Sequence, residues 1–466
     1  MQKDYSEVKG QLRSQEWFNN PHNMGMTAVY VERYMNYGWT REELQSGKPV
    51  IGIAQTGGDL TPCNRIHVEL VDRVKAGIRD NGGIPFEFPV HPIAEQGKRP
   101  TAALDRNLAY LGLVEILHGY PIDGVVLTTG CDKTTPACIM AACTVNLPAI
   151  VLSGGPMLDG HWRGRLAGSG TVVWEARERY AAGEIDYDGF MDIVTSSSPS
   201  VGHCNTMGTA LSMNSLAEAL GLSLTGCAAI PAPYRARKQM AYHTGLRIVD
   251  MVKEDLTPDK ILTPEAFQNA IVVNSALGGS TNAPVHITAI ARHIGQELPA
   301  KDWQTHGHHI PLLVNCQPAA RYSVSKPFLH RAVTCAVIRP RELLVKADKL
   351  PPHCQTVTGK AIGENLTGIA IEDQRVIKPY DQPLKENAGF IVLSGNLFEA
   401  GLLKTSVISD DFRQKYLQRE GDKNAWEGMA VVSTGTPIDL ASPPHQHIND
   451  PACPSIVIHA LGANAA

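Results

Sequence analysis

A thiol, a carboxylate and an amine stand side by side at Cys131, Asp132 and Lys133, three residues after an apolar run at residues 125–127. Such a run, followed by Thr-Thr-Gly, is typical of a buried parallel strand that ends in a tight turn, and the residues after Lys133 are typical of a helix. Parallel sheets bind ligands at the carboxyl ends of their strands, and a helix start favours negative charge. The turn is therefore a candidate metal or cluster site first and a candidate catalytic thiol second.

Two further cysteines share this loop setting. Cys63 lies in Thr-Pro-Cys-Asn, between a β-type run at residues 49–54 and a helical pattern at 65–80. Cys204 lies in a small-residue loop between an apparent strand and a predicted helix start. Three thiolates brought together would hold an iron–sulfur cluster with one coordination position open for substrate. The alternative is that these cysteines, like Cys138 and Cys143 in the next helix, are small hydrophobic core residues.

Oxygen ligands and hydrogen-bond donors are also available near these loops. Glu95, Asp132 and Asp59 could bind a hard divalent ion such as Mg²⁺, although each could equally be a solvated carboxylate or a helix cap. Lys133 could act as a base only if burial or a neighbouring cation lowers its pKa, and is otherwise an ion-pair partner of Asp132. The Gly-Gly-Ser-Thr-Asn run, with Ser280 and Thr281, could donate to a carboxylate or phosphate.

Other motifs narrow the function. The histidines at 306, 308 and 309 and those at 445 and 447 resemble metal ligands by composition, but the sequence favours surface loops for both groups. The chain contains no Gly-x-Gly-x-x-Gly, no phosphate loop, no His-Glu-x-x-His and no Gly-x-Ser-x-Gly. The sequence therefore contains none of the motifs that usually indicate nucleotide-dependent enzymes, zinc proteases or serine hydrolases.

The elements that must position these residues alternate along the chain. After the helical pattern at 65–80 come a strand at 84–90, a polar loop at 91–100, a helix at 101–117, the central strand and a further strand at 149–152. A charged helix is expected at 174–187. This alternation predicts an α/β fold with a doubly wound parallel sheet in an N-terminal domain of residues 1–355. From 356 to 466 short β runs predict a smaller, mainly β domain.

The bulk composition sets outer limits. The 466 residues favour two or three domains, and 43% hydrophobic with 19% charged residues indicates a globular chain. A net charge of −4 gives no basic field for nucleic acid or an anionic membrane. No apolar stretch is long enough to cross a bilayer, and the first residues lack the order of a secretory signal. We therefore expect a cytoplasmic enzyme with reduced thiols.

The cysteine loops also carry a family resemblance. Thr-Pro-Cys63-Asn, Thr-Thr-Gly-Cys131-Asp-Lys-Thr and Gly-His-Cys204-Asn-Thr-Met-Gly resemble the dihydroxy-acid and 6-phosphogluconate dehydratases, as do Asn-Ser-Ala-Leu-Gly-Gly-Ser-Thr-Asn and Leu-Ser-Gly-Asn-Leu-Phe. The resemblance runs from about residue 10 to about residue 435. Pro-Phe-Glu-Phe-Pro-Val-His-Pro and the third cysteine loop are similar to the sugar-acid branch, the L-arabinonate and D-xylonate dehydratases. The branched-chain amino-acid enzyme is the alternative member.

The resemblance implies a [2Fe–2S] cluster and Mg²⁺, removal of water from a 2,3-dihydroxy sugar acid, and a 2-keto-3-deoxy product. It also implies a β-barrel for the C-terminal domain and assembly as a homodimer or homotetramer. The residues that it implicates are Cys63, Cys131 and Cys204 for the cluster, and Glu95, Asp132 and Lys133, the last as a carbamate, for Mg²⁺.

One feature of the family is expected to be missing. The resemblance places the family's base, a serine, and a further glutamate ligand of Mg²⁺ beyond the last residue of this sequence. We therefore expect an incomplete barrel and a C-terminally truncated member that keeps the cluster half of the site but lacks the base. Two alternative functions remain: a catalytically inactive scaffold or subunit, and a zinc- or thiol-based binding protein that uses the same cysteines.

Overall fold

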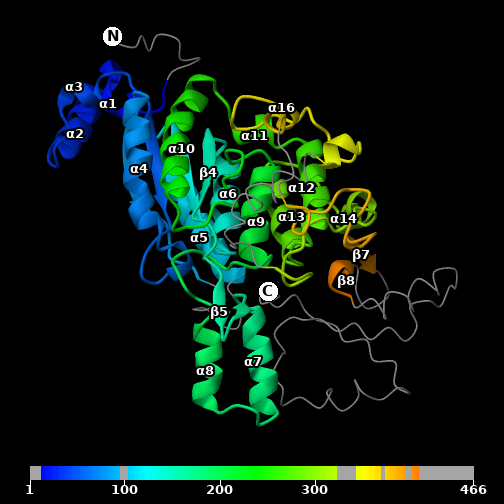
Figure 1. The fold of residues 1–466 in the computed structure, drawn as a ribbon. Helices are drawn as coiled ribbons and strands as arrows, with labels where there is room; N and C mark the ends of the chain where they lie inside the picture. Colours follow the sequence, from blue (N-terminus) through cyan, green and yellow to red (C-terminus); the bar gives the residue numbers. More distant parts are fainter. Residues whose placement is uncertain (1–11, 95–102, 323–342, 369–372, 394–400, 409–466) are drawn as a thin grey trace.

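A four-stranded parallel sheet forms the centre of the computed structural model, which describes residues 12–94, 103–322, 343–368, 373–393 and 401–408. The strand order is β2-β1-β3-β4 (Figure 1). The strands are β1 (Val50–Gln55), β2 (Ile84–Pro89), β3 (Gly124–Thr129) and β4 (Ala149–Ser153). The parallel α/β sheet that the sequence predicts is therefore confirmed.

Burial explains the composition of the strands. Every residue of β1, β3 and β4 is buried, and apart from Gln55 at the end of β1 these strands contain only apolar or small residues. The edge strand β2 alternates, with Glu87 and the half-exposed Phe86 and Phe88 on it. The register pairs Val126 of β3 with Ile53 of β1 on one side and with Ile150 of β4 on the other.

Helices connect and cover the sheet. The helix α4 (His67–Asp80) links β1 to β2, α5 (Ala103–Gly119) links β2 to β3, and α6 (Thr134–Val145) links β3 to β4. Because the direction of strand addition reverses between β2 and β3, right-handed crossovers put α4 and α5 on opposite faces. On the α4 side packs α10 (Arg235–Lys253), and the two helices lie side by side in Figure 1.

Two glycines allow α4 and α10 to approach closely. A Cβ atom added to Gly245 of α10 would lie 2.3 Å from the carbonyl oxygen of Val74, and one added to Gly77 of α4 would lie 2.9 Å from the amide nitrogen of Leu246. Neither contact leaves room for a side chain, because backbone atoms cannot move away cheaply. The crossing therefore requires glycine on both helices.

Two helices project from the body of the molecule where the sequence predicts one. The predicted charged helix at 174–187 is wrong in its bounds: α7 (Thr171–Ala181) ends before Gly183, whose φ is +72°, and α8 (Tyr187–Thr195) begins afterwards. Asp186 caps α8 by accepting from the Gly189 amide at 2.8 Å. With the hairpin β5 (Gly160–Trp162) and β6 (Arg165–Ala167), these helices form the extension at the bottom of Figure 1.

The remaining elements surround this frame. The short N-terminal elements are α1 (Gln15–Phe18), η1 (Pro21–Asn23), α2 (Met24–Met35) and α3 (Arg41–Leu44). The later helices are α9 (Thr209–Ala219), α11 (Pro258–Ile261), α12 (Pro264–Leu277), α13 (Ala283–His293), α14 (Ala300–Gly307) and α16 (Ile362–Asn365). Among the helices of the described ranges, none is long and apolar enough to span a membrane.

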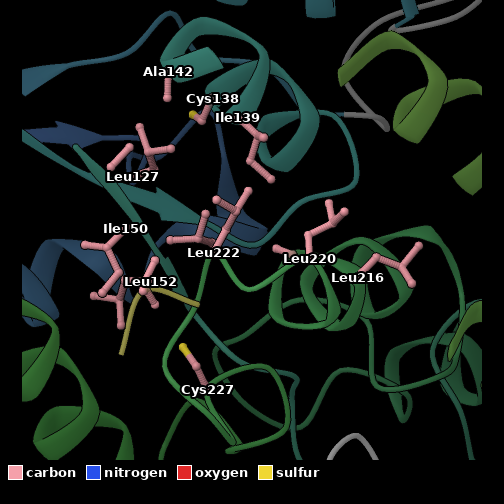
Figure 2. Close-up of a cluster of buried hydrophobic side chains, with 14 of the residues drawn as sticks. Leu127, Cys138, Ile139, Ala142, Ile150, Leu152, Leu216, Leu220, Leu222 and Cys227 are labelled. Atoms are coloured by element: carbon pink, nitrogen blue, oxygen red, sulfur yellow. The ribbon is translucent and has the colours of Figure 1, made fainter. Parts of the chain in front are cut away.

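The central core lies between the sheet and α6 and α9. Figure 2 shows Leu127 and Ile150 of the sheet, Cys138 of α6 and Leu216 of α9 among its buried side chains. Cys138 and Cys143 are core residues, as the sequence predicts, and burial raises the pKa of each thiol to about 12. These two thiols therefore stay protonated and unreactive at neutral pH.

The described residues beyond 355 include little β structure. They contain α16, the antiparallel pair β7 (Phe390–Leu393) and β8 (Gly401–Lys404), and η4 (Thr405–Val407). Phe390 packs edge-on against Trp303 of α14, with ring centroids 5.8 Å apart, so this pair joins the main core. Most of the predicted barrel lies outside the described residues, and both the barrel and the boundary at 355 stay predictions.

Candidate active site

The first two cysteine loops meet where the strand order reverses. Cys63 lies in η2 (Pro62–Asn64), which follows β1, and Cys131 lies one residue beyond Gly130, which follows β3, the neighbouring strand. A Cβ atom added to Gly130 would lie 3.3 Å from the Cys63 carbonyl oxygen. In sheets of this order the crevice between the first and third strands is the usual ligand site. The structure therefore brings both cysteines to the sheet position best suited to a ligand.

Asn64 ties the two loops together. Its side-chain oxygen accepts a hydrogen bond from the Cys131 amide at 2.7 Å, and its nitrogen donates to the hydroxyls of Thr56 and Thr134 at 3.0 and 3.1 Å. Asn64 is fully buried, so these bonds do not compete with water. The sequence analysis did not single out Asn64, although it stands next to Cys63.

Two more buried side chains hold the same turn. Asn214 of α9 accepts from the Thr129 hydroxyl at 2.9 Å and donates to the Gly130 carbonyl at 3.0 Å. The Nε2 atom of His67 lies 2.7 Å from the Thr129 carbonyl, which can only accept, so His67 donates through Nε2. Burial lowers the pKa of His67 to about 4, and the ring is neutral. The turn before Cys131 is thus fixed from several sides.

Asp132 and Lys133 form a buried ion pair. The Lys133 Nζ atom lies 3.0 Å from one carboxylate oxygen of Asp132, and the Cys131 thiol donates to the other at 3.4 Å. Lys133 is 1% exposed, although a lysine normally keeps its ammonium group in water. A buried lysine beside a carboxylate and a thiol is typical of a functional site.

Cys204 reaches this site by a route that the sequence did not predict. Its loop follows the helix α8, not a strand, and α9 begins only at Thr209. The loop is held by a strand-like bridge between Pro156, after β4, and His203, whose carbonyl accepts from the Met157 amide at 2.8 Å. The expected strand before Cys204 is therefore wrong, and the bridge to the β4 loop takes its place.

The charges of two other site residues, Cys63 and Asp132, act on the Cys204 thiol. Burial, and after it the nearby Cys63 and Asp132, raise the pKa of the Cys204 thiol to about 11, because the negative forms of these two groups repel a thiolate. Such repulsion acts over short distances in a protein. Thiolates clustered in this way need a positive centre, which is what an iron–sulfur cluster supplies.

The predicted substrate-binding turn is packed against the start of α9. The Ser280 hydroxyl lies 2.8 Å from the Thr209 hydroxyl and accepts from the Asn282 amide at 3.1 Å, and Ser280 is 3% exposed. Thr281 is half-buried. The turn follows α12, which continues to Leu277. The substrate-binding role of both residues stays a prediction.

The other candidate metal ligands either lie outside the described residues or are not grouped into a metal site. Glu95 and the histidines at 445 and 447 lie outside the described residues, and Asp59 is an exposed ion-pair partner of Arg65, at 3.2 Å. The histidine at 306 belongs to α14, so that group is not a loop throughout. Within the described ranges, no three His, Cys, Asp or Glu side chains are arranged to hold a single metal ion.

Fold and site together define a parallel α/β protein with thiol, carboxylate and amine groups in the turns that follow its strands. Residues 48–365 match the dihydroxy-acid/6-phosphogluconate dehydratase N-terminal family. The chain is 59% identical, over 441 residues, to D-xylonate dehydratase of Caulobacter vibrioides, covering 95% of this chain and 72% of that protein. This chain belongs to the dihydroxy-acid/6-phosphogluconate dehydratase family, as the cysteine loops predict.

Other relatives show how similarity is distributed within the family. L-arabinonate dehydratase of Rhizobium leguminosarum bv. trifolii is 42% identical over 408 residues, which are 87% of this chain and 69% of that protein. Dihydroxy-acid dehydratase of Caldanaerobacter subterraneus is 35% identical over 399 residues, which are 84% of this chain and 69% of that protein. The chain is thus more similar to these sugar-acid enzymes than to this dihydroxy-acid enzyme.

Proposed function

We propose that this protein is a hydro-lyase that removes water from a pentonate, D-xylonate or L-arabinonate, to give a 2-keto-3-deoxy acid. The observation that carries the proposal is the 59% identity to D-xylonate dehydratase along almost the whole chain. The value of 35% for a dihydroxy-acid dehydratase makes a branched-chain substrate the second choice. The packed turn at Cys131, where two cysteine loops meet, supports a catalytic role for this part of the chain.

The residues at the site fit the two cofactors of the proposal. Cys63, Cys131 and Cys204 would hold the [2Fe–2S] cluster, and Asp132 and Lys133, the latter as a carbamate, would hold Mg²⁺ together with Glu95. When bound, the cluster iron supplies a Lewis acid for the departing C3 hydroxyl, and Mg²⁺ supplies charge for the carboxylate end. The neighbouring thiols and the buried carboxylate have the donor chemistry that these groups require.

The protein's own residues keep the site rigid and dry. Asn64, His67 and Asn214 hold the turn before Cys131 in one conformation, so the acidic and thiol groups need no reorganisation when substrate arrives. Lys133 is removed from water, which strengthens every charge interaction around it. Loss of the C2 proton and of the C3 hydroxyl gives an enol, which tautomerises to the 2-keto acid.

Activity and metal analysis together test the proposal. The purified full chain is supplied with D-xylonate, L-arabinonate and a branched-chain 2,3-dihydroxy acid in separate reactions, and the 2-keto product is followed by NMR. Turnover of a pentonate with iron and inorganic sulfide bound supports the proposal. Cluster without turnover of any acid favours an inactive scaffold, and zinc without sulfide favours a binding protein.

We propose further that the enzyme acts in the cytoplasm as a homodimer or homotetramer, with the domains divided near residue 355. The composition and the reduced-thiol chemistry of a cluster support the location. Gel filtration with light scattering tests the assembly, and a monomer at micromolar concentration would contradict it.

A further inference from the structure

A buried histidine behind the site has an unusual partner. The Nδ1 atom of His286, on α13, lies 2.9 Å from an Nη atom of Arg106 on α5. A guanidinium group can only donate, so Nδ1 of His286 must accept. The proton of the neutral imidazole is therefore on Nε2, and this tautomer follows from the identity of the partner alone.

The Nε2–H group is buried without an acceptor among the described residues. His286 is 3% exposed, and its Nε2 atom has no hydrogen-bond partner there. A buried donor without an acceptor is costly, and buried polar groups in native proteins are usually paired. An acceptor oxygen from a bound molecule would remove this cost.

Two other histidines near the site show why His286 is different. His67 and His203 also have one ring nitrogen without a partner, but the other nitrogen of each faces a backbone carbonyl and donates to it. Their unpartnered nitrogen is therefore a bare lone pair, whereas that of His286 carries a hydrogen. Among these three rings, His286 alone presents an unused donor.

The position of His286 connects it to the proposed site. Its helix α13 begins directly after the turn that contains Ser280 and packs against α6, whose first residue follows Lys133. Burial, and after it the charges of Lys133 and Arg106, hold the pKa of His286 well below 6.5. His286 therefore lies on a helix that borders the site, and the charge of Lys133 acts on its ring.

Arg106 also indicates which kind of acceptor suits the Nε2–H group of His286. Donation from a guanidinium to Nδ1 withdraws electrons from the ring and makes Nε2–H a stronger donor. A donor backed by positive charge favours an anionic acceptor, since charge-assisted hydrogen bonds are about twice as strong as neutral ones. The only anionic group of an aldonic acid is its carboxylate.

We propose that His286 donates through Nε2 to the substrate carboxylate, and that Arg106 is a positioning residue that fixes this tautomer. The proposal rests on the sugar-acid function proposed above. It assigns a substrate contact to a residue of α13 that no motif of the sequence indicated.

Paired substitutions separate the two ring nitrogens. His286→Asn keeps an acceptor near the Nδ1 position but no donor near Nε2, whereas His286→Gln keeps a donor near Nε2. We expect His286→Asn to raise the KM for the pentonate about 10- to 100-fold, the effect of losing one hydrogen bond to a charged group, and more than it lowers kcat. His286→Gln should restore most of this loss. Equal effects of the two variants would overturn the proposal.

Further measurements keep structural damage and functional failure apart. Both variants should retain the cluster absorption and the urea midpoint of the wild type, and the pentonamide, which lacks the charge, should bind all forms about equally weakly. Arg106→Met should weaken pentonate binding in the wild type but not in the His286→Asn background, because it acts through His286. Additive effects of the two substitutions would contradict its positioning role.

Calorimetric titration of the pentonate tests the contact without turnover. If the wild type binds but does not dehydrate the acid, the proposed function fails while a weaker titration of His286→Asn still supports the contact. If the wild type dehydrates the acid and His286→Asn binds it normally, the contact fails while the function stands. A wild type that neither binds nor converts the acid overturns both.

Discussion

Asn64 offers a direct test of how the cysteine loops are held. Asn64→Ala removes the acceptor of the Cys131 amide, leaving a buried N–H group unpaired at a cost of about 1–3 kcal/mol. Its two hydroxyl partners lose less, about 0.5 kcal/mol each, because Thr56 and Thr134 also donate to backbone carbonyls. We therefore expect the free energy of unfolding to fall by about 2–4 kcal/mol.

Urea denaturation of the full chain, followed by circular dichroism, measures this change as a shift in midpoint at constant slope. Asn365→Ala is the matched control, since Asn365 is half-buried and bonds to the hydroxyls of Thr356 and Thr358 far along the chain. We expect the control to lose about 1 kcal/mol and to bind iron normally. Equal loss of stability in the two variants, or full iron content in Asn64→Ala, would refute the reasoning.

Three further perturbations follow from the packing and the buried charges. Gly130→Ala places a Cβ atom 2.6 Å from the side-chain oxygen of Asn64 and should abolish iron binding. Gly112→Ala is the control, because open space surrounds this position of α5, and it should raise the free energy of unfolding by about 0.5–1 kcal/mol. Gly245→Ala forces α10 away from the Val74 carbonyl and should lower the thermal midpoint by several degrees, and an unchanged midpoint would contradict the close crossing. The pKa of His67 is lowered from 6.5 to about 4, so between these two pH values the unfolded chain binds a proton that the folded chain does not. The free energy of unfolding therefore falls as the pH drops from 6.5 to about 4. The contribution of His67 to this fall is about 3 kcal/mol. His67→Gln should flatten this part of the stability curve, and an equally steep curve would show that other groups cause it.

Local pattern was enough to predict the framework of the site. The strands β1, β3 and β4 are continuous apolar runs because both faces are buried, and such runs are visible without knowledge of the fold. Helix bounds were predicted well where a pattern met strong end signals, as for α4 before Asn81. The bounds failed at α7 and α8, because the glycine turn that separates them lies inside one continuous stretch of charged residues.

The sequence by itself determined which chemistry this protein carries: thiols, a carboxylate and an amine after the strands, in loops specific enough to indicate the family. Only the tertiary structure decided that Asn64, His67 and Asn214 converge on one turn, that Cys204 arrives beside the β4 loop, and that His286 meets Arg106. The reason is physical. Helices and strands depend on residues a few positions apart, whereas these contacts depend on strand order and helix packing, which bring together residues up to 180 positions apart in the chain.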